Sequence, residues 1–365
     1  LATATGAITG TAPTVSADTT TTFSITATDD ENQTSASRSF SITVQNDAPS
    51  NHFNTVLYTG TGSSQSITSV GFAPDFVWIK DRDATNWHNL QDTIRGATKH
   101  LYSNATNAED TTSNGLTSFD SNGFTIGGGG GFGNNGNNFV AWNFKAGGAA
   151  VANTDGSINS QVSVNNTLGF SIVKYTGNNT AGATVGHGMD AVPELIIWKG
   201  LTSVSGWKVY CNQFTSPTTQ VVELQDTAAV STNTVFINGT APSTSLITLG
   251  AYGDTNGSGQ DIITYNFTSK PGFSKVGSYT GTGSAGQYVV TGFEPAFVMV
   301  KTTSSTSSWF ILDNKRNSNN PRNSYLMANS STATTNAGTG INFLSNGFEL
   351  ESTAFNDPAD WIYLA

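Results

Sequence analysis

The sequence predicts an all-β protein built from tandem antiparallel β-sandwich domains of the jelly-roll or lectin-like type. The first observation is an internal repeat: a set of motifs occurs three times, at intervals of about 100 residues, which is the size of a small domain. The second is that the apolar runs are short and rich in β-branched and aromatic residues, with Gly and Asn turns between them. The third is that no apolar stripe of helical period extends beyond one or two turns.

Two alternating runs precede the repeats. Phe23–Thr28 and Phe40–Val44 alternate with period two, which predicts a β-hairpin with one buried face and a polar turn over Asp29–Ser37. Two strands do not make a stable domain alone. The stretch resembles the last strands of the immunoglobulin-like and cadherin-like domains of bacterial surface and phage virion proteins. We therefore expect residues 1–47 to be the C-terminal part of an Ig-like domain.

Three copies of a β-sandwich domain are expected next, at 52–150, 165–270 and 271–365, and they are called copies 1, 2 and 3 below. Each contains a Pro-led strand that closes on Lys six residues after Pro. These strands read FAPDFVWIK (72–80), AVPELIIWK (191–199) and FEPAFVMVK (293–301). Both faces of each strand are apolar, so we expect a central strand covered by a second sheet on one side and by a neighbour or long loop on the other. Short linkers between such domains predict an extended rod.

Three further features recur in the copies. A Tyr-Thr-Gly motif opens each one, a Trp follows the Pro-led strand at Trp87, Trp207 and Trp309, and an aromatic strand closes the copy. The Trp positions are interpreted as core anchors, with a sugar-stacking platform as the alternative. The closing strands are NFVAWNFKA (138–146), DIITYNFTS (261–269) and DWIYLA (360–365), so copy 3 is expected to be truncated within its last strand.

Copies 1 and 3 share a charged pair that copy 2 lacks. Asp92 with Arg95 and Asp313 with Arg316 have the spacing Asp-x-x-Arg, whereas Cys211 and Phe214 stand at the aligned places. An ion pair that is replaced as a unit by two apolar groups indicates a partly buried structural brace rather than catalysis.

Composition and charge exclude several classes of function. The net charge of −10 repels phosphate backbones and anionic lipid, so neither nucleic acid nor a membrane is expected as a partner. The four His residues are scattered, and the acidic residues Asp81, Asp83 and Asp92 lack the spacing of a calcium loop, which favours a solvated loop. No catalytic constellation is apparent. We expect no enzyme activity, no metal site and no cofactor.

The loop before the closing strand is the candidate ligand-binding site. In each copy it combines an aromatic residue with Asn, Asp and Gly, a chemistry that suits polar ligands such as glycans at the end of a sandwich. The alternative is a tight turn whose aromatic residue covers the core. The candidate residues are Phe132, Asn134, Asn135, Tyr252, Asp254, Asn256, Phe355, Asn356 and Asp357.

The order of five motifs carries a resemblance. YTGTG, GFAPDFVWIK, DTIRGATKHLYSN, SNGFTIGG and NFVAWNFKAGG occur in this order in copy 1 and resemble a tandem repeat domain of virion proteins of tailed phages, especially those of marine bacteria. The resemblance extends over residues 52–365. Copy 2 departs from it, because it lacks the Asp-x-x-Arg pair and the Ser-Asn-Gly-Phe turn.

The resemblance implies a setting on the surface of a virion. It predicts a non-enzymatic structural protein, a tail or capsid fibre or appendage that presents β-domains to the host surface. Expected partners are other virion proteins, copies of the same chain in a homotrimer, and a host-surface glycan. Two alternatives stay open: a carbohydrate-binding adhesin on a bacterial cell surface, and an appendage enzyme that degrades polysaccharide.

Overall fold

The structure is a computed structural model that describes residues 19–28, 31–44, 47–351 and 353–365. It divides into two compact units, Leu1–Asn51 and His52–Ala365. Residues 1–18, which belong to the expected Ig-like segment, and positions 29 and 30 of the expected turn lie outside the described residues. Almost all described elements are β-strands, with one single-turn α-helix, α1 (Gly253–Asn256), and the 3-10 helices η1 (Pro49–Asn51) and η2 (Thr353–Phe355). The all-β prediction is confirmed.

The first unit is the predicted hairpin. Strand β1 (Thr19–Ile25) pairs antiparallel with β2 (Arg38–Val44), and the rings of Phe23 and Phe40 stack at a centroid distance of 5.8 Å. Phe40 is 46% exposed and Ile42 is 48% exposed. The expected buried face of the hairpin is therefore not covered by the residues that the structure describes.

In the second unit each copy contains the same four antiparallel strands, in which the Pro-led strand lies between the closing strand and the strand that follows it in sequence; they form a separate sheet in copy 1 and part of an eight-stranded sheet in each of copies 2 and 3. In copy 1 the order is β3 (Phe53–Thr59), β11 (Asn138–Phe144), β5 (Phe76–Asp81), β6 (Asn89–Asp92). In copy 2 it is β14 (Phe170–Thr176), β21 (Asp261–Phe267), β16 (Leu195–Gly200), β17 (Lys208–Cys211). In copy 3 it is β22 (Val276–Thr280), β29 (Asp360–Leu364), β24 (Phe297–Thr302), β25 (Phe310–Asp313).

A smaller second sheet completes each copy. It consists of β4 (Gln65–Ile67), β10 (Gly123–Ile126) and β9 (Leu116–Asp120) in copy 1, and of β15 (Ala183–Gly186) and β20 (Leu246–Leu249) in copy 2. In copy 3 it consists of β23 (Gln287–Val290), β28 (Gly347–Leu350) and β27 (Thr335–Leu344), which β26 (Arg322–Met327) joins to the first sheet. The main sheet of copy 2 is extended at one edge by β13 (Ser160–Asn165) and β12 (Val151–Asn153) and at the other by β18 (Gln220–Glu223) and β19 (Ser231–Thr232). In copy 1, β7 (Lys99–His100) and β8 (Asp110–Thr111) form a separate pair.

The Tyr-Thr-Gly motif fastens the loop before the closing strand. The Tyr hydroxyl donates to a carbonyl of that loop: Tyr58 to Phe132, Tyr175 to Thr255 and Tyr279 to Phe355, at 2.5–2.7 Å. The Thr hydroxyl bonds to the first side chain of the closing strand, Asn138, Asp261 or Asp360. The Gly permits a close approach, because a Cβ at Gly60 would lie 2.4 Å from the carbonyl oxygen of Asn134. Each residue of the motif thus has a structural role.

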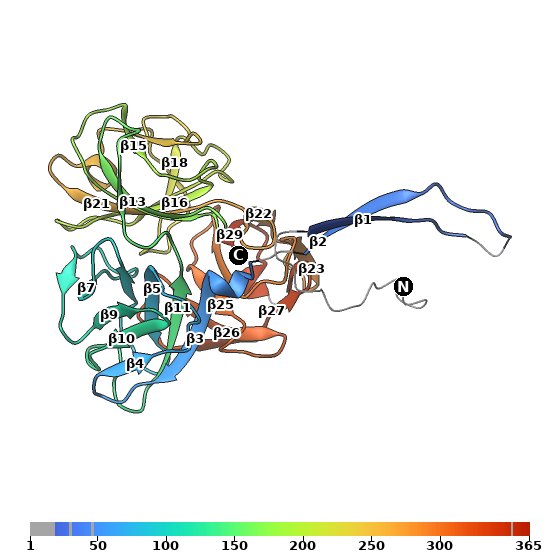
Figure 1. Cartoon of the computed structure of the whole chain (residues 1–365), viewed down its shortest axis with the longest axis horizontal. Coiled ribbons are helices and arrows are strands. Elements are labelled where there is room, and N and C mark those ends of the chain that lie inside the picture. Colours follow the sequence, from blue (N-terminus) through green and yellow to red (C-terminus); the bar gives the residue numbers. More distant parts are fainter. Residues whose placement is uncertain (1–18, 29–30, 45–46, 352) are drawn as a thin grey trace. The chain divides into compact units, whose positions relative to one another are not determined.

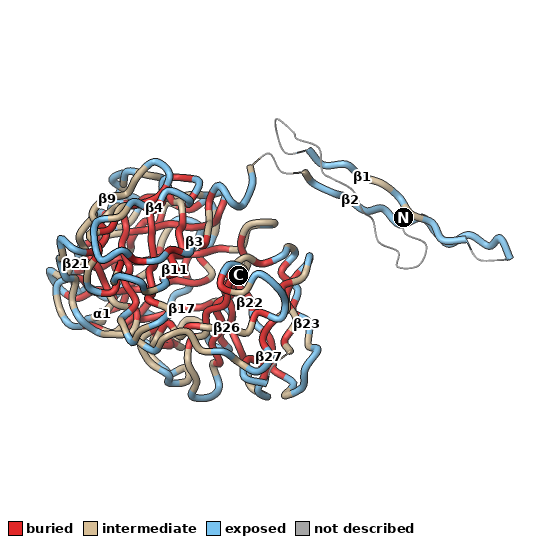
Figure 2. The backbone as a smooth tube through the Cα atoms, turned by 90° about the horizontal axis from the view of Figure 1, so that it is seen from below, coloured by how far each residue is buried: buried red, intermediate tan, exposed pale blue. Residues whose placement is uncertain are grey.

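The Pro-led strands are buried on both faces, as the sequence predicted. Val77 and Ile79 of β5 belong to the core of copy 1 itself, between its two sheets. Phe76 and Trp78, on the opposite face, belong to a second core that contains the equivalent residues of the other copies: Leu195, Ile197, Phe297 and Met299. Figure 1 shows the sheets of the three copies meeting around this shared core, and Figure 2 shows the buried interior of the unit. The expected extended rod is wrong, since three separate domains would have no core in common.

Each copy also buries the Lys that ends its Pro-led strand. Lys80, Lys199 and Lys301 are fully buried, and their ammonium groups donate to backbone carbonyls. Lys199 reaches the carbonyl of Thr106 in copy 1 at 3.3 Å, and Lys301 reaches that of Thr227 in copy 2 at 3.2 Å. Burial lowers the pKa of all three Lys side chains to about 8. Lys199 and Lys301 therefore join neighbouring copies, whereas Lys80 donates to the carbonyls of Asp81 and Ala84 in its own copy.

We predict that replacing Lys199 with Met flattens the dependence of stability on pH. The pKa of Lys199 falls from 10.5 to about 8 on folding, so between these values the unfolded chain holds a proton that the folded chain has lost, and rising pH favours the folded state. The variant loses this contribution, up to about 1.4 kcal/mol per pH unit. Urea unfolding between pH 7 and about 10 measures it. Lys315→Met, at an exposed lysine, is the control, and parallel profiles for all three proteins would contradict the prediction.

Candidate functional site

The three copies join head to tail in a closed ring. A loop of each copy donates a backbone N–H to the residue that lies two positions after the buried Lys of the next copy. These hydrogen bonds run from Glu109 to Leu201, from Val230 to Thr303 and from Thr334 to Arg82, at 2.8–2.9 Å. The interfaces are called 1–2, 2–3 and 3–1 below. Because the same contact occurs in each, positions in one interface can be compared with those in the other two.

The Trp prediction was correct for two copies and wrong for the first. Trp207 and Trp309 are buried, and their indole N–H groups donate at 2.9 Å to the carbonyls of Tyr102 and Glu223 in the preceding copy. Trp87 is 43% exposed. Strand register places His88 at the equivalent position, where it is buried and accepts a hydrogen bond from Trp78 at 2.8 Å. Trp87 is thus one residue away from the position of Trp207 and Trp309, and a shift of one residue along a strand moves a side chain to the opposite face. The comparison of the sequences did not detect this shift.

The Asp-x-x-Arg pairs are braces across the interfaces. Arg95 donates to Asp92 at 2.5 Å, and the hydroxyl of Tyr265 in copy 2 donates to the same carboxylate at 2.8 Å. Arg316 donates to Asp313 at 2.6 Å, and the indole of Trp142 in copy 1 donates to it at 3.1 Å. Burial alone would raise the pKa of Asp313, but Arg316 and Trp142 outweigh it and hold that pKa below its usual value.

Copy 2 replaces this polar set with an apolar one. Cys211 and Phe214 take the places of Asp and Arg, and the residue of copy 3 that corresponds to Trp142 and Tyr265 is Leu364. All three apolar residues are buried in the shared core. The hydrogen-bond donor is therefore present where the carboxylate is present and missing where the thiol replaces it.

The acidic residues of copy 1 match the expected solvated loop only in part, because Asp83 is exposed but Asp81 and Asp92 are buried. Asp81 is fully buried, and it accepts hydrogen bonds from the backbone of Asp83 and Ala84 and from the amides of Asn86 and Asn137. N–H donors thus surround this carboxylate. Within the described residues no cluster of three or more His, Cys, Asp or Glu could hold a metal ion.

The predicted ligand-binding residues do not form one site. Phe132 and Phe355 are buried in two different cores, those of copies 1 and 3, and Tyr252 packs against a third. Asn256 and Asn356 are also buried and bond to the backbone of their own copies. These positions match the alternative of a tight turn with an aromatic lid. Asn134 and Asp254 are half-buried, and Asn135 and Asp357 are exposed, so a role for these four in binding stays a prediction.

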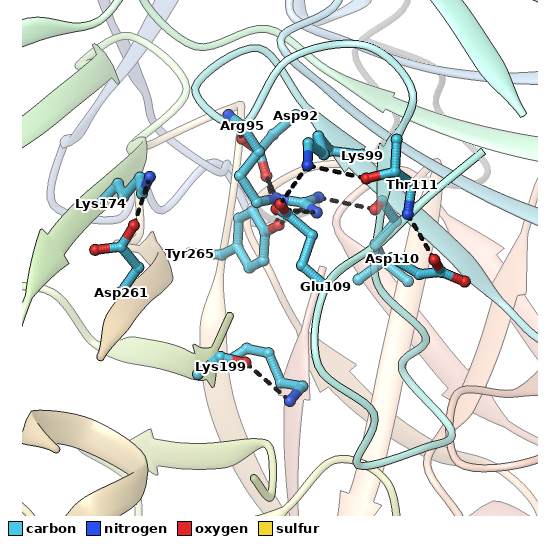
Figure 3. Close-up of polar contacts among 12 residues, drawn as sticks. Asp92, Arg95, Lys99, Glu109, Asp110, Thr111, Lys174, Lys199, Asp261 and Tyr265 are labelled. Atoms are coloured by element: carbon cyan, nitrogen blue, oxygen red, sulfur yellow. Dashed lines mark hydrogen bonds and ion pairs between the residues drawn. The ribbon is translucent and has the colours of Figure 1, made fainter. Parts of the chain in front are cut away.

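Charged side chains occupy the positions around interface 1–2. Glu109 lies 3.5 Å from both Arg95 and Lys99. On the copy 2 side, Lys174 pairs with Asp261 at 3.0 Å. Figure 3 shows Arg95, Lys99 and Glu109 close together, with Lys174 and Asp261 as a separate pair to one side.

Interface 2–3 has uncharged residues at most of the same positions, and it is open. Phe214, Gln220 and Val230 stand where copy 1 has Arg95, Lys99 and Glu109, since Gln220 and Lys99 begin the equivalent strands β18 and β7. Ser278 and Asp360 stand where copy 2 has Lys174 and Asp261. A groove of about 590 Å³ lies here between copies 2 and 3, lined by Gln213, Phe214, Thr215, Gln220, Val230, Ser278, Tyr279, Thr280, Thr303, Ser304, Asp360, Trp361 and Ile362.

Sequence reasoning missed this groove. The sequence did show that copy 2 lacks the Asp-x-x-Arg pair. That loss points to a groove only when it is known which copy lies beside copy 2. We call the groove the 2–3 groove.

Comparison with known proteins gives one match. A family model described as a domain of unknown function, DUF7483, matches residues 48–365. No curated protein and no solved structure matches the chain. Among the described residues, no helix has the length and apolar character needed to cross a membrane.

The compensating replacement at interface 2–3 predicts the outcome of a transplant into interface 1–2. Asp92→Cys alone should cost about 3–5 kcal/mol of unfolding free energy, because it leaves Arg95 buried without its carboxylate. The triple change Asp92→Cys, Arg95→Phe and Tyr265→Leu copies the apolar set and should recover most of this loss. Denaturant unfolding measures both, with Cys211→Asp, which buries an unpaired carboxylate, as the matched control. If the triple variant loses as much unfolding free energy as the three single variants together, the account is contradicted.

Proposed function

The chain belongs to the DUF7483 family, whose function is unknown, so a function has to be argued from the residues of the chain itself. We propose that the chain is a non-enzymatic structural protein of a tailed-phage virion. In this proposal it forms part of a tail or capsid fibre or appendage and presents its β-domains to the host surface. The expected location is the surface of the particle.

One observation carries the proposal: what the three copies share serves the scaffold. The Tyr-Thr-Gly motif holds a loop in place, the Pro-led strand is buried on both faces, and the buried Lys donates to backbone carbonyls, which in copies 2 and 3 include one of the preceding copy. A binding platform needs such a rigid frame, whose variable positions are free for recognition.

Surface chemistry also supports exposure outside a cell. Only 11% of residues are charged, and Ser, Thr, Asn and Gly dominate the polar positions. Ion pairs on an exposed surface lose strength as salt screens them, so a surface of hydroxyls and amides suits a salt-rich medium. The motif order in copy 1 adds the resemblance to virion proteins.

A second candidate is an adhesin on a bacterial cell surface that binds carbohydrate. The observation behind this candidate is the 2–3 groove, whose polar lining is suited to a carbohydrate. This argument does not depend on whether the chain belongs to a particle or to a cell.

Localisation tests the proposal. Antibodies against the chain, used for immunogold electron microscopy and for blots of gradient-purified particles, should label an appendage of the virion. The major capsid protein of the same particles and the envelope of uninfected cells are the controls. Label in the envelope of uninfected cells, with none on particles, would contradict a virion role. Release of reducing ends from host polysaccharide by the purified chain would contradict the non-enzymatic part.

A further inference from the structure

We propose that the 2–3 groove binds an uncharged oligosaccharide. This inference deepens the proposed function, since it names the class of host-surface ligand, and it places recognition between copies rather than in the loops before the closing strands.

The groove lies where copy 2 lacks the charged side chains found at the equivalent positions of interface 1–2. At interface 1–2, Glu109 forms ion pairs with Arg95 and Lys99, each at 3.5 Å. At interface 2–3, Gln220 and Val230 replace the charged pair of Lys99 and Glu109. The resulting volume of about 590 Å³ lies within the usual range for small-ligand sites.

The lining of the groove favours a neutral ligand rich in hydroxyl groups. Most of its exposed lining is polar and carries amides and hydroxyls, and Phe214, Tyr279 and Trp361 also line it but are buried. None of the lining residues is Lys, Arg or His, so the groove offers no cation to an acidic sugar or a phosphate. The residues with rim amides or hydroxyls are Gln213, Thr215, Gln220, Ser278, Thr280, Thr303 and Ser304.

Asp360 is the charged group of the lining, and it has acceptor capacity to spare. Thr280 donates to its Oδ1 at 2.9 Å, while its Oδ2 has no protein partner among the described residues. The equivalent Asp261 is different, because its Oδ2 is paired with Lys174 at 3.0 Å. Copy 3 has Ser278 in place of that lysine. A carboxylate oxygen left open beside amides and hydroxyls is suited to accept hydrogen bonds from sugar hydroxyls.

Both walls of the groove are fixed before a ligand binds. Ser278 of β22 donates to Gln213 of copy 2 at 3.1 Å, and the ring of Tyr279 stacks on that of Trp361 at 5.9 Å. The backbone N–H of Val230 holds copy 2 against Thr303 of copy 3 at 2.9 Å. A preformed site loses less ordering entropy on binding, which is the condition for useful affinity to a solvated sugar.

The experiment is isothermal titration calorimetry of the full chain against neutral oligosaccharides (glucan, galactan and mannan fragments) and acidic ones (sialyllactose and alginate fragments). We expect at least one neutral fragment to bind with a dissociation constant in the range of about 1 mM or tighter. Asp360→Asn should weaken binding about tenfold, the effect of losing a charge-assisted hydrogen bond. Asp261→Asn, the equivalent change at interface 1–2, is the matched control and should bind like the wild type.

A second variant fills the groove. Gln220→Lys with Val230→Glu restores the ion pair of interface 1–2 and should abolish binding while the chain stays folded, as thermal melting will show. The reciprocal variant, Lys99→Gln with Glu109→Val, changes interface 1–2 instead and should bind the oligosaccharide like the wild type.

Several results would overturn the inference: no neutral fragment binds, acidic fragments bind better, or Asp261→Asn weakens binding as much as Asp360→Asn. Failure here is distinguishable from failure of the virion role. A chain found on particles that binds no neutral sugar removes the groove assignment alone, and a sugar-binding chain found in the cell envelope removes the virion role alone.

Discussion

The second unit depends on one constraint: the central sheet of each copy is apolar on both faces. One face is covered by the copy's own smaller sheet, as Val77 and Ile79 show, and the other needs a cover from outside the copy. Phe76 and Trp78 find it against the equivalent residues of copies 2 and 3. Full burial of each such side chain stabilises the fold by about 1.5–3 kcal/mol, and a copy on its own would leave that surface in water. The three copies therefore form one folding unit.

Closing the ring also buries polar groups, and four of them donate hydrogen bonds to a neighbouring copy. Lys199 and Lys301 donate to carbonyls of the preceding copy, and Tyr265 and Trp142 donate to the Asp of another copy's brace. Where the carboxylate is replaced by Cys211, the donor is replaced by Leu364. Such matched sets fix which copy lies beside which, because a mismatch would leave a buried donor or acceptor unpaired. The threefold arrangement expected of a homotrimer thus occurs within one chain, and association of whole chains stays a prediction.

Features that depend on local sequence could be predicted, whereas features that depend on strand register or on contacts between copies could not. The two-sided burial of the Pro-led strands and the role of Asp92 with Arg95 could be predicted, because periodicity and comparison of the copies carry local information. That His88 rather than Trp87 takes the buried position could not be predicted, because the sequence does not show the register of the strand. The 2–3 groove could not be predicted either: its residues come from two copies, and only the fold brings Gln220 near Asp360. The loops before the closing strands looked like binding loops because aromatic and amide residues suit both ligands and turns, and burial of Phe132 and Asn256 separates these roles.

Calorimetric unfolding of the full chain tests the shared core most directly. If the three copies are one unit, His52–Ala365 melts in a single transition whose van't Hoff enthalpy equals the calorimetric enthalpy. Two or more transitions, or a van't Hoff enthalpy of only about a third of the calorimetric value, would show copies that unfold independently and would contradict the account.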